Sequence, residues 1–485
     1  MSNRICLYLL LVMGCASPPE QASPLPNILI LYTDDQGYGD CGAMNPNAKF
    51  ATPHIDRLAR EGVVFTDGHS AGSVCTPSRY ALLTGRYAWR TPLGSGVLGA
   101  DADCMIEDGQ TTIASLLRAS GYRTALFGKW HLGMQIPGEA GRRDWDQPVL
   151  DGPLQKGFDQ FYGIPASMNF GVLTWFDGDR AIEPTSMWTR KKFPTAEITT
   201  PPLDYRMAPP YEPQRQTQRD IEVASGFVDE EALRIITEHA IEFIEAPHQD
   251  PFFAMVAFTS PHLPHCTAPE FRGTSDMGNY GDFMAETDHR IGQILSALRA
   301  SGHEQNTLVL MTSDNGPENN YKDWSQLYQH ESAGGLRGGK RDVYEGGHRV
   351  PFFVRWPQAI QGGQRSNRPI GQVDCLATIA DIVGAPLQPG QAQDSVSFAP
   401  ELLKLVSGTN ARKPLMHHGR GQFAIREGRW KLVFDKNRQD SRKLGQPIEL
   451  YDLHSDPAET NNRRDEAPAI VYALMRRAEE ILGPN

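Results

Sequence analysis

Short hydrophobic runs alternate with amphipathic stretches along most of the chain. Residues 27–33 (NILILYT), 252–258 and 307–312 are apolar runs of strand length, while 230–246 and 282–300 carry hydrophobic residues at helical spacing. Shorter strands are expected at 63–66 and 124–127, and shorter helices from Pro53 and over 111–120. Alternation of this kind predicts an α/β fold, in which a large, mixed but mainly parallel sheet is covered by helices on both faces.

The pattern changes after about residue 386. Residues 422–434 read as two strands around a turn, 449–453 as another strand, and 468–482 as a closing helix. We therefore expect one large catalytic domain over 26–385 and a smaller antiparallel α+β subdomain over 386–485. Residues 171–218 are rich in Pro, Trp and Arg without periodicity, which predicts loops near the mouth of a substrate site.

The first 25 residues have the pattern of an export leader and tether. Arg4 precedes a short apolar run that is too short to span a bilayer, and Gly14 and Cys15 follow before a Ser/Pro-rich stretch. This order resembles a bacterial lipoprotein signal, in which Cys15 would carry the lipid anchor. An ordinary cleaved signal peptide is the close alternative, and a weak transmembrane anchor is the less expected one. The first two predict an exported protein, either periplasmic or anchored as a lipoprotein at the cell surface.

Charge and cysteine content exclude some classes of function. The formal net charge of -11 argues against a nucleic-acid-binding protein, so any anion site must be a local cluster of cations. The seven cysteines are scattered without a CxxC pair, which predicts neither a zinc site nor a dense disulfide framework.

The strongest chemical signal is the segment CTPSR at 75–79, followed by TGR at 84–86. Proline suits the first helical turn, so Cys75 is expected at a helix N-terminus, where free N–H groups favour an anion, with Arg79 one turn further on. A lone cysteine at such a position would more often be structural. The whole segment, however, resembles the signature of the sulfatases, formylglycine-dependent enzymes of the alkaline phosphatase superfamily, in particular the arylsulfatases and N-acetylgalactosamine-6-sulfatases.

This resemblance implies that a maturating enzyme oxidises Cys75 to formylglycine. An ordinary hydroxyl or thiol that accepted a sulfuryl group would be left with a stable ester. A hydrated aldehyde has two hydroxyls: one can attack sulfur, and the other can expel sulfate as the carbonyl forms again.

The resemblance also implies a metal site. Asp34 and Asp35 follow the first predicted strand, Asp314 and Asn315 follow a later one, and the carboxyl ends of parallel strands share one crevice. Three carboxylates and an amide oxygen, beside the modified Cys75, form a hard shell that suits Ca²⁺. Mg²⁺ is the less expected alternative.

Four further segments match the family in the expected order. They are GKWHLG at 128–133, SPHLPH at 260–265, GGK at 338–340 and GFDQFYG at 157–163. By resemblance, Lys129 and Lys340 bind sulfate, His131 acts as base on the formylglycine hydroxyl, and His262 protonates the leaving alcohol. Ser167, after the last segment, is expected to approach bound substrate.

Together these residues predict a sulfuric ester hydrolase. Arg79 and the metal would hold the hydrate, and Asp314 would help to deprotonate it. Aryl sulfates are the expected substrates in vitro and a sulfated carbohydrate is the expected natural substrate. Two alternatives remain at this point: a phosphonate or phosphate monoester hydrolase of the same superfamily, and a non-catalytic lipoprotein that binds sulfated glycans with Cys75 unmodified.

Overall fold

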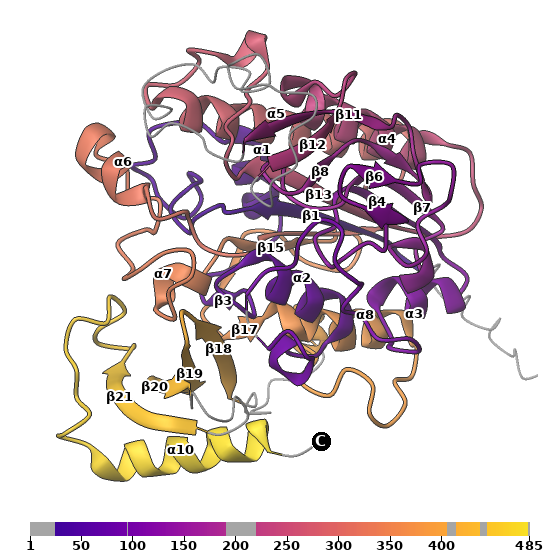
Figure 1. Ribbon diagram of the computed structural model, residues 1–485. Helices are drawn as coiled ribbons and strands as arrows, with labels where there is room; N and C mark the ends of the chain where they lie inside the picture. Colours follow the sequence, from indigo (N-terminus) through magenta and orange to yellow (C-terminus); the bar gives the residue numbers. More distant parts are fainter. Residues whose placement is uncertain (1–24, 95, 191–219, 405–413, 437–443, 484–485) are drawn as a thin grey trace, which may run out of the picture.

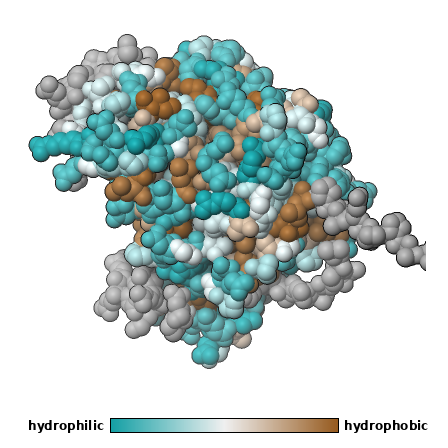
Figure 2. All heavy atoms as spheres, turned by 90° about the vertical axis from the view of Figure 1, so that its right-hand side faces the viewer, coloured by the Kyte–Doolittle hydropathy of each residue, from teal (hydrophilic) through white to brown (hydrophobic). Residues whose placement is uncertain are grey.

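The computed structural model describes residues 25–94, 96–190, 220–404, 414–436 and 444–483. The predicted export leader and its possible lipidation site, Cys15, lie outside these ranges. Within them, no helix is both long enough and apolar enough to cross a membrane. Figure 2 shows a largely hydrophilic face with small, scattered hydrophobic patches.

A ten-stranded sheet forms the centre of the molecule (Figure 1). Its middle strands β4 (Arg123–Lys129), β13 (Phe252–Pro261), β1 (Asn27–Asp34) and β14 (Thr307–Ser313) are adjacent and parallel. The parallel strand β7 (Gln160–Ile164) and then the antiparallel β9 (Phe176–Asp177) and β10 (Arg180–Ala181) extend the β4 edge. On the other side follow β15 (Phe352–Arg355), β2 (Val63–Phe65) and β16 (Gln364–Ser366), with β15 antiparallel to both of its neighbours.

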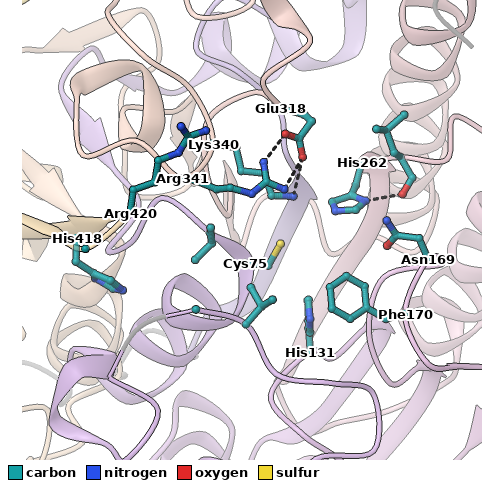
Figure 3. Close-up of a pocket in the computed structure, with 16 residues that line it drawn as sticks. Cys75, His131, Asn169, Phe170, His262, Glu318, Lys340, Arg341, His418 and Arg420 are labelled. Atoms are coloured by element: carbon teal, nitrogen blue, oxygen red, sulfur yellow. Dashed lines mark hydrogen bonds and ion pairs between the residues drawn. The ribbon is translucent and has the colours of Figure 1, made fainter. Parts of the chain in front are cut away.

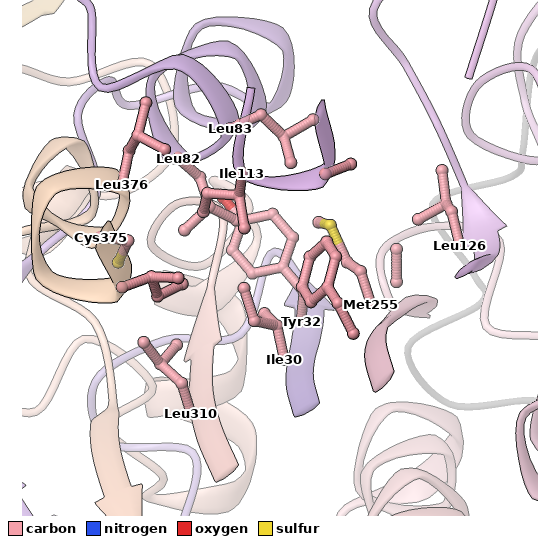
Figure 4. Close-up of a cluster of buried hydrophobic side chains, with 14 of the residues drawn as sticks. Ile30, Tyr32, Leu82, Leu83, Ile113, Leu126, Met255, Leu310, Cys375 and Leu376 are labelled. Atoms are coloured by element: carbon pink, nitrogen blue, oxygen red, sulfur yellow. The ribbon is translucent and has the colours of Figure 1, made fainter. Parts of the chain in front are cut away.

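Helices cover both faces of this sheet. Because successive strand residues point to opposite faces, Ile30 and Tyr32 of β1 pack on one side and Leu29 and Leu31 on the other. One side is covered by α2 (Cys75–Thr84), α3 (Ile113–Ala119) and α8 (Cys375–Val383), and the other by α1 (Pro53–Glu61), α4 (Ala232–Glu245) and α5 (Gly278–Ala300). Figure 4 shows the first of these two cores. The predicted α/β sandwich is confirmed.

The prediction for residues 171–218 is wrong in its first part. Residues 172–190 form short strands, including β8 (Val172–Leu173) and β11 (Thr185–Arg190), which sit on either side of β12 (Asp220–Ala224) in a separate small sheet. The strands β8, β9 (Phe176–Asp177) and β10 (Arg180–Ala181) have two residues each, which is too short to show an alternating pattern, whereas β11 has six residues and could have been recognised. Residues 191–219 lie outside the described part of the chain.

The C-terminal part forms a second, antiparallel sheet, as predicted. Its strands are β18 (Leu415–Gly419), β19 (Gln422–Glu427), β20 (Trp430–Lys436) and β21 (Leu444–Asp452), and α10 (Pro468–Leu482) packs its apolar face on them. A domain boundary near residue 386 stays a prediction.

A buried carboxylate on α5 caps the helix α1. Thr52 precedes α1 but makes no side-chain capping bond. The Asp288 carboxylate instead accepts the N–H groups of His54 at 3.0 Å and Ile55 at 2.8 Å. We expect Asp288→Ala to lower the free energy of unfolding by about 1–3 kcal/mol, because one buried and one part-buried donor lose their acceptor. Guanidinium denaturation measures this. Asp288→Asn keeps one acceptor oxygen and should therefore lose less stability than Asp288→Ala. An alanine variant as stable as the wild type would contradict the cap.

Candidate active site

Four neighbouring strand ends bring the predicted polar residues together. Thr33 of β1 is in register with Ser313 of β14, so Asp34 and Asp314 follow side by side at the same edge. Lys129 is the last residue of β4, and His262 directly follows β13, which lies between β4 and β1. These four side chains and that of Asp35 are all buried.

Cys75 faces this edge from the first position of α2. The preceding residue is extended, and the helix begins at Cys75 as predicted. The thiol lies 3.5 Å from Asp34 Oδ1 and also lines a cavity. Burial, and next the charge of Asp314, raise the pKa of the Cys75 thiol. An unmodified thiol here would stay protonated and be a weak nucleophile.

Each of three buried carboxylates has a cationic partner. Lys129 Nζ lies 2.5 Å from Asp34 Oδ2, and Lys340 Nζ lies 2.7 Å from Asp35 Oδ2. Arg79 contacts Asp314 Oδ2 through Nε at 2.9 Å and Nη2 at 2.8 Å. These three pairs balance in charge, so the site can take up both a divalent cation and an anionic substrate.

The same carboxylates fit a hard metal ion. Ligand atoms of Asp34, Asp35, Cys75 and His262 lie within 4.8 Å of one another. Asn315 Nδ2 donates to Asp35 Oδ1 at 2.7 Å, while its buried Oδ1 has no hydrogen-bond partner in the described chain. An orphaned carbonyl oxygen next to carboxylates provides oxygen ligands of the kind that hard divalent cations prefer. The oxygens of Asp314 are engaged by Arg79 and by the backbone N–H of Asp35 at 3.2 Å.

Two of the predicted catalytic residues that line the cavity are histidines, His131 and His262. Burial, and next the charge of Lys129, hold the pKa of His131 well below its usual value. Its Nε2 is 3.1 Å from Leu98 O and therefore donates, which leaves Nδ1 as a buried acceptor with no partner among the described residues. Burial, and next the charge of Lys340, lower the pKa of His262 to about 3. Both rings are therefore neutral at neutral pH.

The cavity measures about 540 Å³ and is open above Cys75. Figure 3 shows Arg341, Arg420 and His418 on one side of Cys75, and His262, Asn169 and Phe170 on the other. Of the predicted site residues, Cys75, His131, His262 and Lys340 line it. Lining residues with polar or aromatic side chains that the sequence analysis did not predict are Glu318, Arg341, His418, Arg420, Asn169 and Phe170. Only Glu318 and Arg341 carried a usable signal, since they lie beside the predicted segments at 314–315 and 338–340.

Ser167 is not among the lining residues of this cavity. Its side chain is buried, and its hydroxyl has no hydrogen-bond partner in the part of the chain that the structure describes. Asn169, two residues later, does line the cavity. Contact of Ser167 with substrate stays a prediction.

Comparison with known proteins gives the family. The family model described as Sulfatase matches residues 26–385. The chain belongs to the sulfatase family. A second family model, the N-sulphoglucosamine sulphohydrolase C-terminal region, matches residues 338–481 of this sulfatase. The resemblance drawn from the sequence motifs is thus confirmed, and the chain is a sulfatase-type enzyme that hydrolyses sulfate esters.

Named relatives agree with this membership. An N-acetylgalactosamine-6-O-sulfatase of Bacteroides thetaiotaomicron is 31% identical over 97% of this chain and 96% of its own length. Human arylsulfatase A is 32% identical over 93% of this chain and 86% of its own. A solved structure from work on the metabolism of multiple glycosaminoglycans by Bacteroides thetaiotaomicron has a TM-score of 0.80 at 28% identity, covering 95% of this chain and 100% of its own.

The fold is shared more widely than the activity. A phosphonate monoester hydrolase of Agrobacterium radiobacter superposes with a TM-score of 0.60 at 19% identity, over 94% of this chain and 95% of its own. At that identity the likeness shows the fold alone. It shows that the same fold occurs in a phosphonate monoester hydrolase, and it leaves the choice of ester to the site.

Proposed function

We propose that this sulfatase removes sulfate from sulfated carbohydrates, with residue 75 as formylglycine and Ca²⁺ as its metal. The observation that carries the proposal is the position of Cys75 in the lining of the cavity, within 4.8 Å of ligand atoms of Asp34 and Asp35, which are each paired with a lysine. The names of the relatives, an N-acetylgalactosamine-6-O-sulfatase among them, support a sugar substrate.

Residue 75 would supply the nucleophile. In the hydrate of formylglycine, one hydroxyl bonds to sulfur and the other re-forms the carbonyl when sulfate leaves. Arg79 would hold this side chain in place from the next turn of α2. Burial, and next the charge of Asp34, raise the pKa of Asp314, so its carboxylate is a stronger base than an exposed aspartate for taking a hydroxyl proton.

Asp34, Asp35, Asp314 and Asn315 would hold Ca²⁺, which would neutralise charge on the bound sulfate group. Lys129 and Lys340 would bind the sulfate oxygens. Both are buried and cationic, so they attract an anion in a medium that screens little. Mg²⁺ would require a more regular shell of six oxygens.

The two histidines would move protons on either side of the sulfate. His131 is neutral with Nδ1 unpaired among the described residues, so it can accept the proton that leaves residue 75 when sulfate is expelled. His262 must first gain a second proton to protonate the departing alcohol. Asp35 Oδ2, 3.7 Å from Nε2, and the incoming sulfate both favour that charged form.

Export and maturation complete the proposal. Export would follow from the leader at residues 1–25, with or without a lipid on Cys15. A formylglycine-generating enzyme would be the one obligatory protein partner, because the proposed nucleophile does not exist before Cys75 is oxidised.

The choice of ester gives a direct prediction. The carboxylate of Glu318 lies 3.7 Å from Lys340 Nζ and repels the second negative charge of a phosphate monoester. We expect kcat/KM for 4-nitrophenyl sulfate to exceed that for the matching phosphate and phosphonate by at least about tenfold, which corresponds to about 1.4 kcal/mol in transition-state binding. Faster turnover of the phosphonate would favour the alternative hydrolase.

A further inference from the structure

Three charged residues of the cavity take no direct part in the proposed sulfuryl transfer. Glu318 lies in the loop after β14, Arg341 directly follows Lys340, and Arg420 forms the turn between β18 and β19. Glu318 and Arg341 lie in loops, whereas Arg420 belongs to the C-terminal sheet. Figure 3 shows Arg341 and Arg420 on the same side of Cys75, with Glu318 bound to Arg341.

The Glu318 carboxylate is fixed by its neighbours. Arg341 binds it through both terminal nitrogens, with Nη2 2.9 Å from Oε2, and the backbone N–H of Asn319 donates to Oε1 at 2.8 Å. The side chain of Glu318 is 17% exposed and that of Arg420 is 54% exposed. A carboxylate held beside guanidinium groups offers acceptors and donors that are already oriented and still accessible.

The backbone that carries these residues is equally constrained. The Arg341 N–H donates to Ser73 O at 2.7 Å, which ties this loop to the segment leading into α2. A Cβ at Gly419 would stand 2.4 Å from Arg341 O, so only glycine lets the β18–β19 turn approach this closely. The turn that bears Arg420 therefore has a fixed position over the cavity.

Backbone strain points to the same residues. Eight non-glycine residues of the described chain have a positive φ, and four of them belong to this site: Asp35 (66°), His131 (60°), Arg341 (76°) and Arg420 (43°). Such conformations cost free energy and persist where the surroundings impose them, often at functional sites. Asp35 and His131 serve the proposed chemistry, and the two arginines share their backbone conformation.

The charges of Glu318, Arg341, Arg420 and Asp342 on this side of the cavity nearly cancel. Arg341 is paired with Glu318, and Arg420 Nε lies 3.3 Å from Asp342 Oδ1. A surface with nearly equal positive and negative charge does not attract a second anionic group strongly. Paired hydrogen-bond donors and acceptors suit neutral hydroxyls instead. On the opposite side, Phe170 and Leu263 give the cavity apolar surface that can pack on the C–H face of a sugar ring.

The geometry points to Glu318, Arg341 and Arg420 as a hydroxyl-binding wall that selects a pyranose sulfate with free ring hydroxyls near the sulfated carbon. This inference rests on the proposed function. Glu318 would accept hydrogen bonds from the sugar, and the two guanidinium groups would donate them. These are specificity residues, because they touch the sugar and not the sulfur.

Glu318→Gln separates this role from a structural one. We expect kcat/KM for the best substrate in a panel of monosulfated hexoses and N-acetylhexosamines to fall about 10- to 100-fold, the effect of losing a hydrogen bond to a charged group. Turnover of 4-nitrophenyl sulfate, which has no sugar hydroxyls, should stay level or rise, because a charge that repels sulfate is removed from beside Lys340. Arg420→Ala should likewise lower kcat/KM for the sugar sulfate and not turnover of 4-nitrophenyl sulfate.

Glu304→Gln is the matched control. Glu304 is 15% exposed, is paired with Arg299 and Arg355, and precedes β14 at the opposite end from Asp314. Replacing Glu304 should change turnover of neither the sugar sulfate nor 4-nitrophenyl sulfate. Equal losses of activity on sugar and aryl sulfates in Glu318→Gln would contradict a hydroxyl-binding role of this wall. An unchanged activity on every sugar sulfate would contradict it as well. A wild-type enzyme that turns over the aryl sulfate but no sugar sulfate would overturn both the hydroxyl-binding wall and the carbohydrate substrate of the proposed function, whereas the two outcomes for Glu318→Gln would overturn the wall alone.

Discussion

Replacing Cys75 with alanine is expected to reduce turnover of 4-nitrophenyl sulfate on the order of 10⁴- to 10⁶-fold, the range found when a nucleophile is removed but the rest of a site stays intact. The side chain of residue 75 sits at the floor of the cavity, next to Asp34. Alanine provides no aldehyde, and none of the surrounding side chains can replace a geminal diol. Steady-state rates at saturating substrate measure the loss.

Cys41 provides the matched control for this substitution. It is also a free, fully buried cysteine, but it does not line the cavity. Cys41→Ala should cost stability and leave the rate per folded molecule within a few-fold, as expected for a change that only leaves a small cavity. Thermal unfolding of both variants shows that they fold. Turnover by Cys75→Ala close to that of the wild type would refute the nucleophile assignment.

Removal of the metal is expected to have the second largest effect. Chelation should lower turnover by about 10²- to 10⁴-fold, because a bound cation supplies several kcal/mol of transition-state charge stabilisation. Ca²⁺ should restore the rate better than Mg²⁺. Independently of activity, Ca²⁺ at 100 times its Kd should stabilise the folded protein by about 2.7 kcal/mol, seen as a rise in Tm.

Asp35→Ala tests whether this ion binds at the strand ends. Asp35 is within ligand distance of the other candidate donors, and Asn315 is bound to it. The variant should lose the calcium-dependent rise in Tm, whereas the exposed Asp381→Ala should keep it. A metal-free protein with full activity, or an undiminished calcium response in Asp35→Ala, would rule out a functional ion at these strand ends.

The sequence predicted the floor of the site well because the strands that build it are fully buried. β1, β13 and β14 are hydrophobic over most of their length, so the polar residues that follow mark the strand ends. Parallel pairing then brings those ends to one edge, which is why Asp34 and Asp314 could be placed together across a separation of hundreds of residues.

The wall of the cavity could not be predicted in the same way. Arg420 reaches the site because a turn of the second sheet packs against the loop at Arg341, and nothing in the local pattern specifies how two sheets meet. Asn169 and Phe170 lie in the loop after β7, where sequence reasoning placed only Ser167. The two-residue strands over 172–181 were missed because strands of that length leave no periodicity.

An aldehyde made from Cys75 should perform the hydrolysis, and the decisive measurement is a correlation. Protein would be prepared with and without a formylglycine-generating enzyme, the converted fraction of residue 75 determined by peptide mass spectrometry, and specific activity on 4-nitrophenyl sulfate measured for each preparation. We expect activity to rise in proportion to the converted fraction, along a line through the origin. Turnover by protein in which residue 75 is entirely cysteine would show that the aldehyde is not the nucleophile.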